Sequence, residues 1–87
     1  MYKIYATAKV EKEIEKLAKE DAKRVSQEIL KLKRPFKQKL EIKKIAGQPG
    51  FFRLRTGKVR VIFEIDKKKK EVWIRKVGYR PGFYRFF

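Results

Sequence analysis

The fold of this chain is decided by a run of ten residues, Phe52-Arg53-Leu54-Arg55-Thr56-Gly57-Lys58-Val59-Arg60-Val61. Apolar and basic side chains alternate on both sides of Thr56-Gly57, a pattern typical of a β-hairpin with a tight turn. With Thr56 and Gly57 as the two loop residues, Arg53 is expected to face Arg60 across the strand pair. Because like charges in opposite positions destabilise a sheet, this pair of arginines indicates a site that binds an anion.

The same alternation extends away from the hairpin on both sides. It predicts strands over residues 2–6, 51–55, 59–65 and 71–77, and a period of two also covers residues 40–43. Between residues 7 and 35 the apolar period is helical, with Thr7 and Asp21 as expected N-caps and Pro35 as the end of the second helix. The apolar stripes of these two helices are Val10, Ile14, Leu17 and Ala18, then Val25, Ile29 and Leu32.

These elements predict one α+β domain over residues 1–87, in the order β-α-α-β-β-β. A twisted, mostly antiparallel sheet should carry the helical hairpin on one face. If the hairpins pair in simple even registers, that covered face contains Phe52, Leu54, Val59, Val61, Phe63, Ile65, Val72 and Ile74. The opposite face should then be open and should contain Arg53, Arg55, Arg60, Ile62, Glu64, Trp73 and Arg75.

The charge of the chain is strongly positive and unevenly distributed. Its formal net charge is +16, and residues 1–33 contain nine basic and six acidic residues whereas residues 34–87 contain seventeen and four. The second part therefore indicates a surface for a polyanion. The chain has no cysteine and no histidine, which excludes disulfides, thiolate nucleophiles, Cys/His zinc sites and an imidazole base. We expect a cytoplasmic protein without a signal peptide, membrane span, metal or cofactor.

Basic and aromatic residues together favour RNA as the polyanion. Arginine donates paired hydrogen bonds to phosphate, and an aromatic ring can stack on a base. The tail after the last strand adds Arg80 and Tyr84, which could fold back over the open face. The predicted RNA site thus consists of Arg53, Arg60, Arg80 and Tyr84, with Arg55, Arg75, Lys58 and Lys43 as further RNA-binding residues. Trp73 could stack on a base or lie beneath an apolar side chain of a partner.

Two segments resemble a known family. The hairpin from Leu54 to Phe63 and the ending Val77-Gly78-Tyr79-Arg80 with a following Tyr84 are similar to the RelE/ParE toxin superfamily, and specifically to its RelE branch. The resemblance covers almost the whole chain. It implies the toxin of a type II toxin–antitoxin pair, which cuts messenger RNA in the ribosomal A site and inhibits translation.

The resemblance also implies roles for the site residues. In RelE-type toxins a 2′-hydroxyl attacks its own 3′-phosphate without a metal. By position, Arg60 would neutralise the scissile phosphate, Arg80 would stabilise or protonate the leaving 5′-oxygen, and Tyr84 would stack on a base. Arg53 stands where the family commonly has lysine. Since arginine is a poor base, the proton acceptor is left open among Tyr84, Lys37, Lys39 and Lys43.

Partners and alternatives follow from the same comparison. The resemblance implies a RelB-type antitoxin, the ribosome and messenger RNA as partners, and operator DNA only through the antitoxin. One alternative is a ParE-like inhibitor of DNA gyrase, which does not need the ribonuclease residues. Another is a small RNA- or DNA-binding module without chemistry, which the charge alone would favour.

Overall fold

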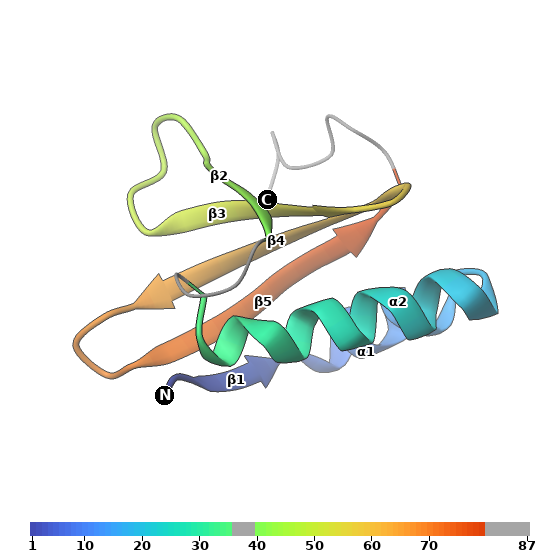
Figure 1. Ribbon diagram of the computed structural model, residues 1–87, viewed down its shortest axis with the longest axis horizontal. Coiled ribbons are helices and arrows are strands. Elements are labelled where there is room, and N and C mark those ends of the chain that lie inside the picture. Colours follow the sequence, from blue (N-terminus) through green and yellow to red (C-terminus); the bar gives the residue numbers. More distant parts are fainter. Residues whose placement is uncertain (36–39, 80–87) are drawn as a thin grey trace.

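The computed structural model describes residues 1–35 and 40–79, so that residues 36–39 and 80–87 are outside the description. Five strands form one sheet in the order β1-β5-β4-β3-β2, with β1 parallel to β5 and every other pair antiparallel. Two helices pack on one face of this sheet (Figure 1). The elements are β1 (Lys3–Ala6), α1 (Ala8–Glu15), α2 (Lys19–Leu30), a 3₁₀ turn η1 (Lys31–Lys33), β2 (Glu41–Lys44), β3 (Phe51–Thr56), β4 (Val59–Asp66) and β5 (Glu71–Gly78).

This architecture confirms the predicted α+β fold with a helical hairpin on one face of a mostly antiparallel sheet. The predicted order had three strands after the helices, and the structure has four. The additional strand is β2, which forms where the alternation of residues 40–43 was noted. Strand β2 forms one edge of the sheet and pairs with β3.

The two helices begin in different ways. The Thr7 side chain accepts a hydrogen bond of 3.2 Å from the Val10 N–H and caps α1, as predicted. The prediction of Asp21 as N-cap of α2 is wrong, because α2 begins at Lys19 after Ala18. Asp21 lies in the first turn, where a carboxylate is favoured by the helix dipole. There its Oδ2 accepts a hydrogen bond of 2.8 Å from the Tyr79 hydroxyl.

The core lies between the helices and the covered face of the sheet. All eight residues predicted for that face are buried: Phe52, Leu54, Val59, Val61, Phe63, Ile65, Val72 and Ile74. Val10, Val25 and Leu32 pack against them from the helical side and are fully buried. The choice of core face from the alternation is therefore confirmed. The prediction of Ile62 as a residue of an open surface is wrong, because Ile62 lies opposite Arg53 and is fully buried.

The turn between β3 and β4 is displaced from its predicted position. Thr56 pairs with Val59, so the two loop residues are Gly57 and Lys58. Gly57 has a φ of 59°, and glycine with positive φ at the first loop position is typical of a type II′ turn, which suits the twist of a hairpin. As a result Arg60 faces Arg55, and the predicted pairing of Arg53 with Arg60 is wrong because Arg53 faces Ile62.

Strands β4 and β5 contain a β-bulge, so the simple register predicted for this pair is also wrong. Ile62 pairs with Lys76 and Phe63 pairs with Ile74, which leaves Arg75 as the extra residue. Beyond the bulge Val77 returns to the core, where it is only 3% exposed. Bulges are common beside functional sites because they redirect side chains.

Candidate nucleic-acid interface

The candidate interface is the side of the sheet that the helices do not cover, which we call the open face. Two rows of residues run across it from β2 to β5 near the β3–β4 turn. The first row is Glu41, Arg55, Arg60 and Gly78, and the second is Lys43, Arg53, Ile62 and Lys76. Because residues two apart on a strand share a face, these rows place Arg53, Arg55, Arg60 and Lys43 together.

Arg60 is the most unusual residue of the open face. Its Nη1 donates a hydrogen bond of 3.4 Å to the Lys58 carbonyl, whereas its Nε is buried without a hydrogen-bond partner among the described residues. An unsatisfied buried donor is costly, and more so when it is charged. Gly78 is directly opposite Arg60 on β5 and has no side chain to occupy the space beside it. This arrangement suits an anion that would accept from the guanidinium.

The other basic residues of these rows are more exposed than Arg60. Arg55 is exposed, and its Nε is 3.8 Å from Oε2 of Glu41, a distance at which a surface ion pair contributes little. Lys43 and Lys58 are exposed and Arg53 is half-buried. Arg53 and Arg55 also help to line a small pocket of about 170 Å³ together with β2. The structure therefore brings together five of the predicted site residues near one end of the sheet.

The other half of the open face is aromatic and acidic rather than basic. The Trp73 ring stacks on Tyr5 with centroids 4.8 Å apart, and the Arg75 guanidinium carbon lies 5.2 Å from the Trp73 centroid. Trp73 Nε1 also donates to Glu71 Oε1 at 3.1 Å. Arg75 donates twice to Glu64 Oε1, at 3.2 and 2.7 Å. Contact of Arg75 with RNA would therefore require this ion pair to open.

The end of β5 is attached to the helices by two side-chain contacts. Glu13 Oε1 accepts a hydrogen bond of 3.0 Å from the Val77 N–H. The Tyr79 hydroxyl donates to Asp21 and accepts from the Ala18 N–H at 2.9 Å. The chain is thus fixed on the helical side just before Arg80. Arg80, Tyr84, Lys37 and Lys39 themselves lie outside the described residues.

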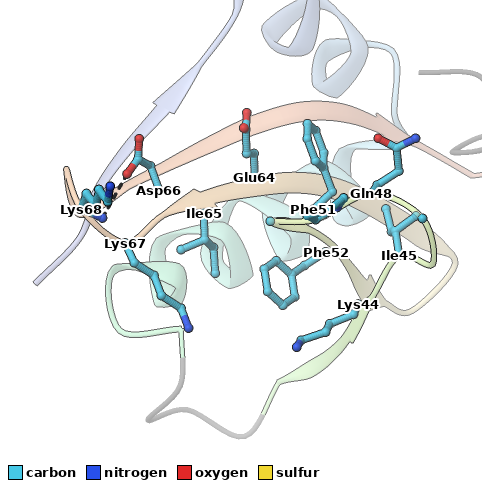
Figure 2. Close-up of a pocket in the computed structure, with 13 residues that line it drawn as sticks. Lys44, Ile45, Gln48, Phe51, Phe52, Glu64, Ile65, Asp66, Lys67 and Lys68 are labelled. Atoms are coloured by element: carbon cyan, nitrogen blue, oxygen red, sulfur yellow. Dashed lines mark hydrogen bonds between the residues drawn. The ribbon is translucent and has the colours of Figure 1, made fainter.

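A second, wider hollow lies at the opposite end of the sheet. This pocket of about 710 Å³ is bounded by the turn between β2 and β3 and by the turn between β4 and β5. Figure 2 shows Phe51, Glu64 and Asp66 on one side of the strands and Phe52 and Ile65 on the other. Its lining mixes acidic, basic and apolar groups, and it is remote in the sheet from the row of Arg60.

Sequence reasoning missed several residues of the open face, among them Lys76 and Glu41. Lys76 lies there because of the bulge, and no alternation pattern could have indicated it. Glu41 lies beside Arg55 because β2 pairs with β3, and it is an acidic residue of this face in addition to Glu64 and Glu71. In residues 1–35 and 40–79 no group of three or more Asp or Glu side chains is arranged to hold a metal ion. No helix within the same residues is long and apolar enough to cross a membrane.

The comparisons with known proteins identify the family. Residues 4–81 match the family model of the ParE toxin of the type II toxin–antitoxin system parDE. The chain belongs to this toxin family. The family match, together with the structural neighbours below, confirms the resemblance to the RelE/ParE superfamily. No curated protein matches the chain significantly in sequence.

Solved structures similar to this ParE-family chain include RelE toxins and their complexes. A chain of the archaeal RelE–RelB complex from Pyrococcus horikoshii is 26% identical, with a TM-score of 0.78 over 93% of this chain and 97% of that chain. The RelB–RelE complex from Methanococcus jannaschii gives 24% identity and a TM-score of 0.77 over 95% and 98%. The isolated Escherichia coli RelE toxin is 17% identical, with a TM-score of 0.75 over 98% of this chain and 93% of that chain. At these identities, the last two show a common fold.

Proposed function

We propose that this toxin-family chain is a ribosome-dependent endoribonuclease that cuts messenger RNA in the A site. The observation that carries the proposal is Arg60, whose buried Nε has no partner among the described residues and which stands among Arg53, Arg55 and Lys43. A half-buried guanidinium whose buried Nε is an unused donor is suited to a phosphate that arrives with the substrate. The exposed cations around it would bind the neighbouring phosphates.

The proposed reaction is an internal transfer within the RNA. The 2′-oxygen of one nucleotide attacks the adjacent phosphorus, and the bond from phosphorus to the 5′-oxygen of the next nucleotide breaks. The products are a 2′,3′-cyclic phosphate and a free 5′-hydroxyl, with one proton lost from the 2′-hydroxyl and one gained by the 5′-oxygen. Arg60 would stabilise the charge on the phosphorane oxygens. Arg80 would assist the leaving oxygen and Tyr84 would stack on a base, while Tyr84, Lys37, Lys39 and Lys43 are candidates for the proton acceptor.

Primer extension on ribosomes programmed with a defined message tests this proposal. The wild-type protein should produce a cut within the A-site codon, and Arg60→Ala should slow it by about 10²–10³-fold, the usual effect of losing one well-placed donor. Lys69→Ala is the matched control, because Lys69 is an exposed cation in the β4–β5 turn. Absence of an A-site cut, or equal cutting by Arg60→Ala, would contradict the nuclease assignment.

The matched family model favours one alternative, inhibition of DNA gyrase as in ParE toxins. This activity would require no RNA chemistry from Arg60. Purified gyrase incubated with supercoiled plasmid and the toxin distinguishes the two, since stabilised DNA breaks without any cut in the message would indicate the gyrase inhibitor.

An antitoxin is the expected protein partner of the toxin. RelE toxins of similar fold have been crystallised with RelB antitoxins from Pyrococcus horikoshii and Methanococcus jannaschii. For this chain we expect an acidic RelB-type segment that covers the open face or displaces its residues. The basic rows near Arg60 would attract such a segment. Co-expression followed by hydrogen exchange should show protection of β3 and β4, and unchanged exchange would contradict this surface.

A further inference from the structure

The bulge in β5 presents two cations to the open face instead of one. In a regular strand Arg75 and Lys76 would point to opposite faces. Here Ile74 and Val77 are both buried in the core, at 0% and 3% exposure, and the two residues between them lie on the other side. Lys76 is half-buried and pairs with Ile62, in the row next to Arg60. A bulge is the device by which a sheet redirects a side chain in this way.

The two cations of the bulge have different surroundings. Arg75 is held by Glu64 through contacts of 2.7 and 3.2 Å, and by the Trp73 ring at 5.2 Å. Its charge is therefore neutralised at the aromatic half of the face. Lys76 is one residue further along β5 and is adjacent to the basic half. The bulge thus places Arg75 in the aromatic half of the open face and Lys76 beside its basic half.

Lys76 and Arg60 are diagonal neighbours on the open face. Lys76 is opposite Ile62, and Arg60 is two residues from Ile62 on the same strand. Diagonal positions of this kind are about 7–8 Å apart, and side chains as long as lysine and arginine converge easily over that distance. Gly78 is opposite Arg60, and a Cβ placed on it would meet no atom within 4 Å in the described part of the chain. Arg60 and Lys76 therefore flank one position of the sheet, to which Gly78 adds no side chain.

We propose that Lys76 is a further catalytic residue, whose ammonium group contacts the same phosphodiester as Arg60; this inference rests on the proposed RNA cleavage. The phosphorane formed during the transfer carries more negative charge than the ground-state phosphate. Arg60 offers a planar fork to its oxygens and Lys76 offers a compact point charge. Two cations on one phosphate stabilise the transition state more than the bound substrate, so that the main effect is on kcat.

Cleavage kinetics on programmed ribosomes test this role. Lys76→Met, which keeps the length but not the charge, should lower kcat by about 10²-fold while KM for the programmed ribosome changes little. Lys76→Arg should restore most of kcat because it restores the charge, and Lys69→Met should behave as wild type. Thermal unfolding of each variant checks that the fold is retained. Wild-type kcat in Lys76→Met, or equal loss in Lys76→Arg, overturns the proposal.

A measurement without cleavage separates this inference from the proposed function. In an NMR titration of the wild-type protein with a trinucleotide that carries a 2′-deoxyribose at the cut, the side-chain signals of Arg60 and Lys76 should shift together. A shift of Arg60 without Lys76, or of neither, overturns the role of Lys76. If both signals shift but the protein cuts no messenger RNA, the shared phosphate contact is supported and the nuclease assignment is rejected.

Discussion

At the scale of single residues, Arg60 destabilises the folded chain and is suited to bind an anion. Its Nε is desolvated without a partner in the described structure, and it stands opposite a second arginine, Arg55. Both features destabilise the folded chain. A cation that destabilises the fold and lies among other cations is typical of a functional site, where activity is maintained at the expense of stability.

Arg60→Met should therefore stabilise the protein while it slows RNA cleavage by about 10²–10³-fold. Methionine preserves the apolar stem and removes both the unsatisfied donor and the repulsion from Arg55, so we expect a gain of about 1 kcal/mol in the free energy of unfolding. Urea denaturation followed by circular dichroism measures it. Lys69→Met serves as the control and should change stability by less than about 0.5 kcal/mol. A loss of stability in Arg60→Met would show that the guanidinium holds the sheet together.

At the scale of elements, the β3–β4 turn depends on Gly57. Its φ is 59°, and a Cβ at this position would lie 2.6 Å from Nη1 of Arg24 on α2. Arg24 is exposed and can move aside, whereas the backbone cannot change φ without altering the turn. The conformation of the main chain, rather than the contact with Arg24, therefore determines the requirement for glycine.

Gly57→Ala should destabilise the protein by about 1–2 kcal/mol, because alanine is strained at positive φ. The free energy of unfolding in urea is the measurement. The double variant Gly57→Ala with Arg24→Ala should recover little of the loss. Gly78 has no positive φ, and a Cβ added to it would meet no atom within 4 Å in the described part of the chain. Gly78→Ala should therefore leave the free energy of unfolding nearly unchanged. Full recovery in the double variant would assign the effect to the steric contact instead.

The same elements explain what the sequence could and could not predict. The sequence pattern predicts the turn one residue early, yet it predicts the two faces of the sheet correctly. Moving the turn by one position shifts the register by two residues and preserves which side chains point inward. The bulge was not predictable, since Arg75-Lys76 fits a regular strand equally well, and for that reason Lys76 was missed. Asp21 satisfies the usual composition of an N-cap, but it lies in the first turn of α2, where it accepts a tertiary hydrogen bond from Tyr79.

At the scale of the whole molecule, the uneven distribution of charge along the sequence becomes an uneven distribution of charge over the surface. The thirteen excess positive charges of residues 34–87 belong largely to the strands and turns, and on the open face the basic rows occupy the end near the β3–β4 turn. The helices carry mixed charges on their exposed sides. Binding to a polyanion should therefore depend on a few positions of the sheet and not on the net charge of +16 as a whole.

The salt dependence of binding to a fluorescent oligouridylate tests this localisation. For single strands, the logarithm of the association constant falls with the logarithm of salt concentration by about 0.7 for each phosphate that is neutralised. Lys43→Gln and Arg55→Gln, on adjacent rows of the open face, should each reduce the slope by about 0.7. Lys12→Gln removes an exposed charge from α1 and should leave the slope unchanged. An equal reduction by Lys12→Gln would mean that the polyanion responds to the total charge of the molecule, and the open face would then lose its claim to be the binding surface.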